Sequence, residues 1–476
     1  MVKIMTSRRS KGACQHRMKS SQPRAKGAKV LALLIALSAS ALSTAKSDPA
    51  IERSEELKSP EQLLGVADTF VLKNGLRVVV IPRFDTESVL HMVWYRTGAA
   101  DDPPGKSGLA HFVEHLTFGS MEMNDRYSDF HALERQAVQL EAYTAYDQTV
   151  YYQEVPLEAL PLAMSVEAKR MRELSITAKA MIFERKAIRQ ERADERFEGE
   201  GDQHRQLHSA LYRGHPYSQS VLGKTQELAS ITAEDAKAYH RQWYTPNNAV
   251  LIIAGPVRTQ TLRPVIQEHY VGIPARPLAD RRAATASLPQ PRLPVTRLHQ
   301  NWGQTVGIRE YLAPSYVTGA AEHTYALQVL AALLGGDLEG RLYRRVVREL
   351  GIARDITVTY EPDSVGLAPF TIEVTASSRE KVEQALATID LELNSIRLKG
   401  PLETELDHAK SMLLAQTAQL QRDRDAWAER IGTALTSGRT HEDLQAWPER
   451  INEVTADDVR RSVHAILQSR LVVTVR

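Results

Sequence analysis

The segment 110–116, Ala-His-Phe-Val-Glu-His-Leu, holds the residues best suited to chemistry. On a helix, His111 and His115 lie on one face, four residues apart, and can offer two imidazoles to one metal ion. Glu114 follows His111 by three residues, so its carboxylate reaches the same region without being a necessary ligand. This order inverts the His-Glu-x-x-His arrangement, with Glu before the second His. The segment therefore predicts metal-assisted hydrolysis.

A hydrolytic zinc site takes three protein ligands and leaves a fourth position open for water. Candidates for the third ligand lie in the predicted helix 181–197, where Glu184 and Glu191 are seven residues apart, two turns along one face. Acidic residues in such a charged stretch commonly form a solvated face instead. The pattern alone leaves both interpretations open.

Short strands and helices alternate around these residues. Strands are predicted at 69–71, 76–81 and 89–96, with an Asn-Gly hairpin signal at 73–75, and a further strand within 142–155. Apolar periodicity predicts helices over 108–118, 128–139, 157–174 and 178–197. Strands and helices mixed in this way indicate an α+β fold.

An internal repeat divides the chain. The segment 231–236, Ile-Thr-Ala-Glu-Asp-Ala, recurs at 454–459 as Val-Thr-Ala-Asp-Asp-Val, and each copy leads through a helix-like run to an apolar strand, at 249–254 and 471–475. In both copies the threonine is a helix N-cap candidate with acidic residues after it. We expect two similar halves of about 200 residues, at 60–269 and 301–476, joined by a Pro-, Arg- and Ala-rich linker at 270–300.

Residues 1–45 resemble an export signal. They contain nine Lys and Arg and no acidic residue, an apolar run from Val30 to Leu37, and then small residues up to Ala45. The apolar run is shorter than the roughly 20 residues of a spanning helix, so we expect no membrane span in the mature chain. The prediction is cleavage after Ala45 and a periplasmic location; the alternative is a membrane anchor formed by an uncleaved signal. Translation starts at Met1 or Met18.

Composition excludes several classes of protein. Without residues 1–45 the chain has 51 Lys and Arg against 58 Asp and Glu, which argues against a nucleic-acid binder. The one cysteine, Cys14, lies in the predicted signal. The mature chain therefore has no thiol nucleophile, disulfide or cysteine zinc ligand.

Taken together, the motifs resemble those of the pitrilysin/insulinase family of inverted-motif zinc peptidases, especially its shorter bacterial members related to the mitochondrial processing peptidase. In that family the third ligand is a glutamate that follows the second histidine by 76 residues, and another glutamate precedes this ligand by seven residues. Glu191 occupies the position of the ligand and Glu184 that of the preceding glutamate. Further similarity lies at 108–110, 142–151 and 214–217, and the resemblance covers about residues 65–476.

The resemblance implies a fold and a set of roles. The two halves would each be a mostly antiparallel sheet with packed helices, facing each other across a cleft. His111, His115 and Glu191 would hold one Zn²⁺ per chain, Glu114 would take a proton from water, and Glu184 would orient a ligand from outside the first coordination shell. An unfolded peptide substrate would add to the sheet edge formed by three residues, namely Ala142, Tyr143 and Thr144.

The second half departs from the family. Active members commonly carry an Arg and a Tyr seven residues apart there, but Val347 and Arg354 occupy those positions. Our hypothesis is that this chain is the zinc-bearing subunit of a heterodimer, with a homologous partner subunit that carries the missing pair.

Two other functions remain open. A two-His-one-carboxylate Fe(II) oxygenase uses the same ligand types, although Glu114 then has no role. A non-catalytic peptide-binding or assembly subunit could retain the peptidase fold, although such relatives usually lose the ligands that this chain keeps.

Overall fold

The computed structural model describes residues 2–5, 67–122, 128–197, 208–279, 281, 295–301, 304–467 and 473–475. The expected signal peptide, residues 1–45, lies outside this part of the chain apart from Val2–Met5. Among the described residues, no helix combines the length and apolarity needed to cross a membrane.

The N-terminal half is built on a seven-stranded sheet with the order β1-β5-β6-β4-β7-β3-β2. All neighbours are antiparallel except β3 and β7, which are parallel. Strand β5 has only β1 beyond it, so it lies at the sheet edge of the region 67–279. The strands are β1 (Val2–Met5), β2 (Asp68–Val71), β3 (Arg77–Pro82), β4 (Ser88–Tyr95), β5 (Gln139–Thr144), β6 (Thr149–Pro156) and β7 (Ala249–Gly255).

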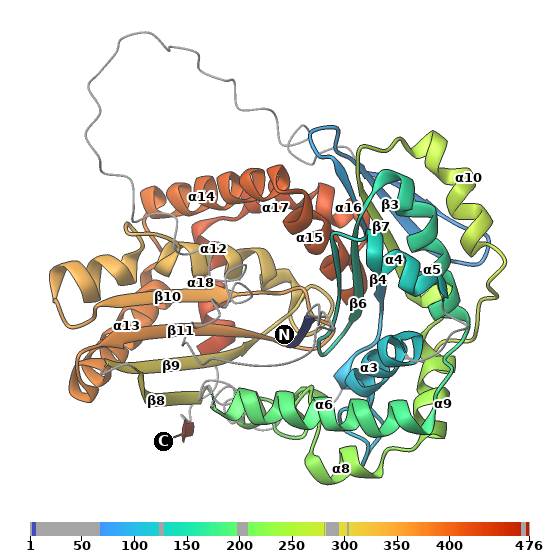
Figure 1. Ribbon diagram of the computed structural model, residues 1–476. Helices are drawn as coiled ribbons and strands as arrows, with labels where there is room; N and C mark the ends of the chain where they lie inside the picture. Colours follow the sequence, from blue (N-terminus) through green and yellow to red (C-terminus); the bar gives the residue numbers. More distant parts are fainter. Residues whose placement is uncertain are drawn as a thin grey trace, which may run out of the picture. The chain divides into compact units, whose positions relative to one another are not determined.

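Helices cover both faces of this sheet, which explains why β3 is apolar at consecutive positions. Val78 and Val80 face one core and Val79 and Ile81 the other. Figure 1 shows α4 and α5 on one side of the sheet and α15 on the other. The helices of this half are α3 (Leu109–Glu122), α4 (Ser128–Gln136), α5 (Leu160–Arg172), α6 (Ala178–Phe197), α8 (Thr225–Ser230), α9 (Ala233–Trp243) and α10 (Thr259–Tyr270), with short 3₁₀ turns at Ala99–Asp101, Leu157–Ala159, Pro216–Ser218 and Pro246–Asn248.

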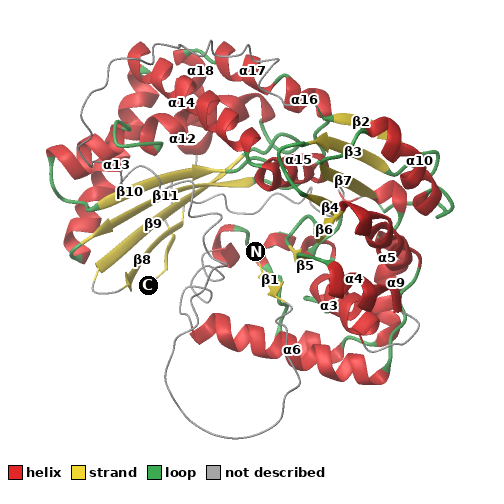
Figure 2. Cartoon of the chain, turned by 45° about the horizontal axis from the view of Figure 1, so that its top comes forward, coloured by secondary structure: helices red, strands yellow, loops and turns green. Residues whose placement is uncertain are grey.

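The C-terminal half has a five-stranded sheet with the order β10-β11-β9-β8-β12, in which only β8 and β12 are parallel. Figure 2 shows α12, α14 and α18 on one side of its strands. The elements are β8 (Val295–Asn301), β9 (Gln304–Ala313), α12 (Thr324–Gly335), the π-helical η7 (Tyr343–Glu349), β10 (Asp355–Tyr360), β11 (Ala368–Ala376), α13 (Arg379–Lys399), α14 (Glu403–Arg422), α15 (Arg424–Ser437), α16 (His441–Gln445), α17 (Trp447–Glu453), α18 (Ala456–Leu467) and β12 (Val473–Val475), with a 3₁₀ turn at Ala321–His323.

The repeat appears in both halves as a capped helix followed by a strand. Thr232 accepts a hydrogen bond from Asp235 N and caps α9, and Thr455 accepts one from Asp458 N at the start of α18. Helix α9 leads to β7, which runs parallel to β3, and helix α18 leads to β12, which runs parallel to β8. The predicted α+β fold with two similar halves is confirmed.

Two features differ from the expected boundaries. Strand β8 begins within residues 270–300 and ends at Asn301, so the second sheet begins inside the expected linker. Helix α15 belongs to the second half by sequence but packs on the first sheet, where Trp94 leaves no room for a side chain at Gly432. Both features depend on tertiary contacts, which the local sequence pattern did not reveal.

Candidate metal centre

Helix α3 begins just before the metal motif because a carboxylate fixes its first turn. Asp102 accepts hydrogen bonds from Gly108 N and Ala110 N, both at 2.7 Å. These contacts satisfy amide groups that have no partner within the helix. Gly108 has φ +87° and lies against the backbone of Gly223, so the turn requires a residue without a side chain. This start sets the rotation of α3 and places His111 within its first turn.

The structure brings His111, His115 and Glu191 together. One ligand atom from each lies within 4.8 Å of the others. Glu191 Oε2 is 3.7 Å from His111 Nε2, and Glu191 Oε1 is 3.4 Å from His115 Nε2. The two histidines come from α3, as the four-residue spacing predicts, and the carboxylate comes from the neighbouring helix α6.

The polar atoms of this group fit a metal ion. Among the described residues, four buried ligand-side atoms make no hydrogen bond: both nitrogens of His111, Nε2 of His115 and Oε2 of Glu191. Buried polar atoms normally find a partner, since leaving one unsatisfied costs about 1–3 kcal/mol. Burial lowers the pKa of His111 well below its usual range, which keeps its imidazole neutral. Two imidazoles and one carboxylate are a donor set that zinc accepts while leaving a coordination position open.

Glu184 is buried and contacts His115 rather than an arginine. Its Oε2 lies 3.0 Å from His115 Nδ1. This contact directs the other nitrogen, Nε2, toward Glu191, which is how carboxylates commonly orient ligating histidines. Burial lowers the pKa of His115, but the neighbouring carboxylates Glu184 and Glu191 outweigh it and raise the pKa to about 9. Metal binding at Nε2 therefore displaces a proton.

Gly119 makes the approach of Glu184 possible. A side chain at position 119 would lie within 2.2 Å of Glu184 Oε1. Sequence reasoning missed this residue, although a glycine one helical turn after His115 on a metal-binding helix was an available signal.

Glu114 is fully buried beside the ligands and is held by the edge strand. Its Oε2 accepts a hydrogen bond from Thr144 Oγ1, whereas its Oε1 finds no partner among the described residues. Burial raises the pKa of Glu114 to about 8, opposed by His115 and by the hydrogen bond from Thr144. A carboxyl group with this pKa can accept and release a proton near neutral pH.

The edge strand β5 carries all three residues expected to bind substrate. Ala142, Tyr143 and Thr144 are buried, and Tyr143 donates a hydrogen bond to Glu429 of α15. Strand β1 pairs antiparallel with β5, with Val2 opposite Thr144 and Met5 opposite Glu141. The edge beside Glu114 therefore accepts an extended backbone.

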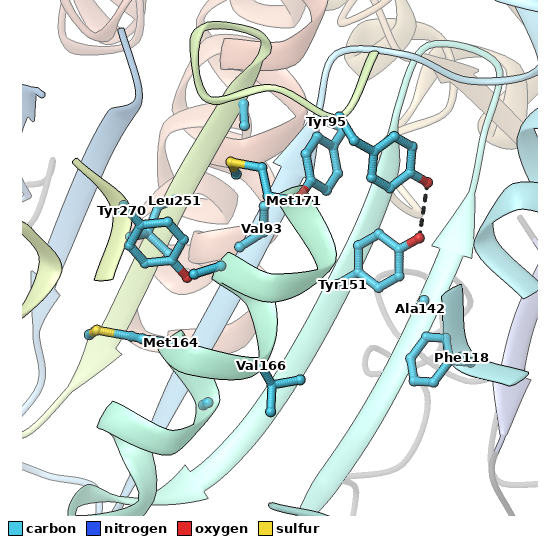
Figure 3. Close-up of a cluster of buried hydrophobic side chains, with 14 of the residues drawn as sticks. Val93, Tyr95, Phe118, Ala142, Tyr151, Met164, Val166, Met171, Leu251 and Tyr270 are labelled. Atoms are coloured by element: carbon cyan, nitrogen blue, oxygen red, sulfur yellow. Dashed lines mark hydrogen bonds between the residues drawn. The ribbon is translucent and has the colours of Figure 1, made fainter. Parts of the chain in front are cut away.

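A hydroxyl chain that sequence reasoning missed lies behind Glu114. Thr117 donates to the carbonyl of Glu114 at 2.7 Å and contacts Tyr151 OH at 2.8 Å, and Tyr151 OH contacts Tyr244 OH at 2.9 Å. Figure 3 shows Tyr151 close to Phe118 and Ala142 in the core. These links join the metal helix to β6 and fix its position against the sheet.

Comparison with known families agrees with this geometry. The model described as "Insulinase (Peptidase family M16)" matches residues 77–225, which include all four of His111, Glu114, His115 and Glu191. The model described as "Peptidase M16 inactive domain" matches residues 230–413. The chain belongs to the pitrilysin/insulinase family. The resemblance found in its motifs is thereby confirmed.

Relatives within the family cover nearly the whole chain. An uncharacterized zinc protease of Mycobacterium leprae is 26% identical over 426 residues, which span 87% of this chain and 92% of the relative. A protease from Helicobacter pylori has a crystal structure with TM-score 0.73 and 20% identity, covering 87% of this chain and 100% of that chain. The periplasmic protease PqqL from Escherichia coli gives TM-score 0.71 and 20% identity, covering 86% of this chain and 47% of that longer one.

Proposed function

We propose that the chain is a zinc-dependent endopeptidase that hydrolyses unfolded peptides. The observation that carries the proposal is the group His111, His115 and Glu191, with unpartnered ligand atoms, beside a buried Glu114 held by the edge strand. A zinc ion held by these three residues supplies a Lewis acid that lowers the pKa of water and polarises a carbonyl group.

Glu114 is the group that moves the proton. Its Oε1 is free among the described residues and accepts a proton from the attacking water, while Thr144 holds Oε2 in place. The same carboxyl then delivers the proton to the leaving amine, because its raised pKa makes both transfers accessible near neutral pH. Proton transfer by a positioned group contributes about 10²–10⁴-fold to the rate.

The edge of β5 orients the substrate. A peptide in the place of β1 is held by backbone hydrogen bonds, which give affinity with little dependence on sequence. An unfolded peptide can adopt the extended conformation that this pairing needs, so we propose unfolded peptides as the substrate class.

The catalytic chain is proposed to be one subunit of a heterodimer. Val347 is half-buried within η7 against the second core, and Arg354 donates its backbone N–H to Thr375 O before β10 begins. Neither position supplies the Arg and Tyr side chains of active relatives, so a homologous partner subunit would supply them. Full activity of a purified, stable monomer or homodimer would overturn the heterodimer proposal.

Export is proposed from the leader. Residues 1–45 have the charge and apolar pattern of a signal peptide, and a periplasmic protease is among the structures that the chain resembles. We propose a periplasmic mature form with an N-terminal half at 60–269 and a C-terminal half that begins with β8. N-terminal sequencing of the exported protein tests the cleavage site after Ala45.

A second candidate is a non-catalytic peptide-binding subunit. The observation that favours it is the match of residues 230–413 to a domain described as inactive. An Fe(II) enzyme is the remaining alternative for the same ligands.

One experiment separates these functions. Protein comprising residues 46–476 is analysed for bound metal after purification without added metal, and its cleavage of a mixed peptide library is followed by mass spectrometry. We expect zinc, residual cleavage by the isolated chain that a chelator abolishes, and a Glu114→Gln variant that keeps zinc but loses turnover. Glu134→Gln, which changes an exposed carboxylate on α4, is the matched control and should retain activity. Bound iron would contradict the zinc proposal, and equal cleavage by Glu114→Gln would contradict the role of Glu114.

A further inference from the structure

A cavity of about 180 Å³ lies where the edge strand β5 ends. We call it the β5-end pocket. Its wall is formed by the β5–β6 turn at 145–148, by aromatic residues between 208 and 217, and by the loop of the second half at 363–369. No role in the proposed reaction has been given to any of these residues.

Aromatic rings make up much of the wall. The rings of Tyr146 and His208 stack with centroids 4.9 Å apart and planes 8° from parallel. Tyr212 lies 4.7 Å from His208 and 5.2 Å from Tyr217 between ring centroids. The aromatic walls are mutually supported, so the cavity is preformed.

The two carboxylates at the pocket are already engaged. Asp147 contacts Arg281 at 3.4 Å and accepts hydrogen bonds from Val365 N and Tyr217 OH. Asp363 contacts Arg430 at 2.7 Å and Arg439 at 3.4 Å. Because each acid is neutralised by a buried arginine, the pocket does not select a basic side chain, and its rings favour an apolar one.

The pocket lies on the path of a peptide bound to β5. The antiparallel register places Val2 of β1 opposite Thr144, the residue that touches Glu114. Residues further toward the N-terminus of such a peptide continue past Thr144, toward Ala145 and Tyr146, at about 3.3 Å per residue. A side chain one to three residues before the cleaved bond therefore reaches the pocket.

We propose that the β5-end pocket binds an aromatic or large aliphatic side chain of the substrate on the N-terminal side of the cleaved bond. The inference rests on the proposed peptidase function and names its substrate class. An enclosed apolar cavity of about 150 Å³ admits benzene, so the volume here accommodates a phenyl ring. Burying such a side chain is expected to improve binding about 10- to 100-fold over alanine.

Binding is measured on the zinc-loaded Glu114→Gln variant, which separates the pocket from turnover. A series of extended peptides carries one Phe at successive positions in an otherwise Ala- and Ser-rich sequence, and affinity is read by fluorescence anisotropy. We expect one position at which Phe binds at least 10-fold more tightly than Ala. On the active enzyme, mass spectrometry should place the same residue one to three positions before the cut.

Variants of Tyr146 assign the effect to this pocket. Tyr146→Phe keeps the ring and should retain the preference for Phe. Tyr146→Ala removes one ring of the stacked pair, so the Phe and Ala peptides should then bind with affinities that differ by less than threefold. Thermal melting checks that each variant is folded, and His208→Ala removes the other half of the stacked pair if Tyr146→Ala does not fold.

The possible failures are distinguishable. Cleavage without a preferred apolar residue at a fixed position, or an unchanged preference in Tyr146→Ala, overturns the pocket and leaves the peptidase proposal intact. Absence of any cleavage by zinc-loaded wild type contradicts the proposed activity of the isolated chain, while the binding series on Glu114→Gln still decides the pocket.

Discussion

Helices α3 and α12 occupy the same place in the two halves but hold very different interiors. Each lies in the chain between the first strands of its half and a hairpin, β5–β6 or β10–β11, and packs against the capped helix of its half, α9 or α18. Helix α3 buries His111, Glu114 and His115, whereas α12 buries mainly alanine, leucine and valine.

The two helices differ in whether their buried polar atoms have hydrogen-bond partners. In α12, Gln328 donates to Thr324 O and Tyr316 OH and accepts from Trp447 Nε1, so its amide is satisfied within the second half. In α3, both nitrogens of His111 lack a partner among the described residues. Within the described part of the chain, the group on α3 and α6 is the one cluster suited to a metal ion. The comparison teaches that, among the residues that the structure describes, α3 leaves buried polar atoms unsatisfied, which costs stability, whereas the buried Gln328 of α12 is satisfied.

Changing a buried polar residue to leucine should have opposite effects in the two helices. His111→Leu removes a ligand, so zinc binding and peptide turnover should fall below detection. Its metal-free form should be more stable than metal-free wild type by about 1–3 kcal/mol, because an unsatisfied buried group is removed. Gln328→Leu should instead be destabilising by about 1–3 kcal/mol, because Trp447 Nε1 loses its acceptor.

Urea unfolding of metal-free wild type and both variants measures this contrast, with zinc content read in parallel. If both substitutions destabilised the protein by the same amount, the two helices would not differ in how their buried polar groups affect stability.

Removal of zinc should weaken one half of the chain only. A ligand at 100 times its dissociation constant stabilises the folded state by about 2.7 kcal/mol. Chelation should therefore speed hydrogen exchange in α3 and α6, where the ligands lie, and leave α12 and α18 unchanged. Hydrogen exchange followed by peptide mass spectrometry measures each helix separately. Equal loss of protection in α12 would mean that the halves open together.

The sequence predicts what depends on neighbours along the chain. The spacing of His111 and His115 follows from helix geometry alone, and helix α6 spans the predicted range Ala178–Phe197. The third ligand, Glu191, is 76 residues away, so it was assigned by resemblance and not by local pattern.

Contacts made in the folded chain could not be predicted in the same way. The hydrogen bond from Thr144 to Glu114 joins a strand to a helix, and the space at Gly119 matters only because Glu184 approaches from α6. Strand β8 begins inside the segment 270–300, whose Pro-, Arg- and Ala-rich composition predicts a linker; its partners β9 and β12 supply the pairing that makes it a strand.

Glu184, which contacts His115, and Gly119, which makes room for Glu184, should affect zinc affinity to different degrees. Glu184→Ala should weaken zinc binding about 10- to 100-fold, since partners of ligating histidines have effects of this size. Gly119→Ala should weaken it less, because the Glu184 side chain it would meet is flexible and can shift. Competition with a zinc chelator of known affinity measures both. Gly335→Ala in α12, which would meet Val358 of β10, is the control and should leave zinc affinity unchanged. Unchanged affinity in Glu184→Ala would remove Glu184 from the site.

The buried carboxyl group of Glu310 in the second half should make the stability of the protein depend on pH. Burial raises the pKa of Glu310, on β9, to about 7, opposed only by the hydrogen bond from Thr371. The folded state therefore favours the protonated form, so the stability contributed by Glu310 is fully present below about pH 4.5 and is lost as pH rises through 7. Glu310→Gln cannot ionise. It should match wild type at pH 5 and exceed it at pH 8 by on the order of 2 kcal/mol.

This titration lies far from the metal ligands in sequence and should not depend on zinc. Urea unfolding at pH 5 to 8, with and without chelator, measures it, and the difference between wild type and Glu310→Gln should be the same in both conditions. Parallel pH profiles for the two proteins would show that folding does not raise the pKa of Glu310. If the stability difference between wild type and Glu310→Gln disappeared with chelator, the second half would be coupled to the metal centre. The contrast between α3 and α12 would then hold for the two helices but not for the two halves.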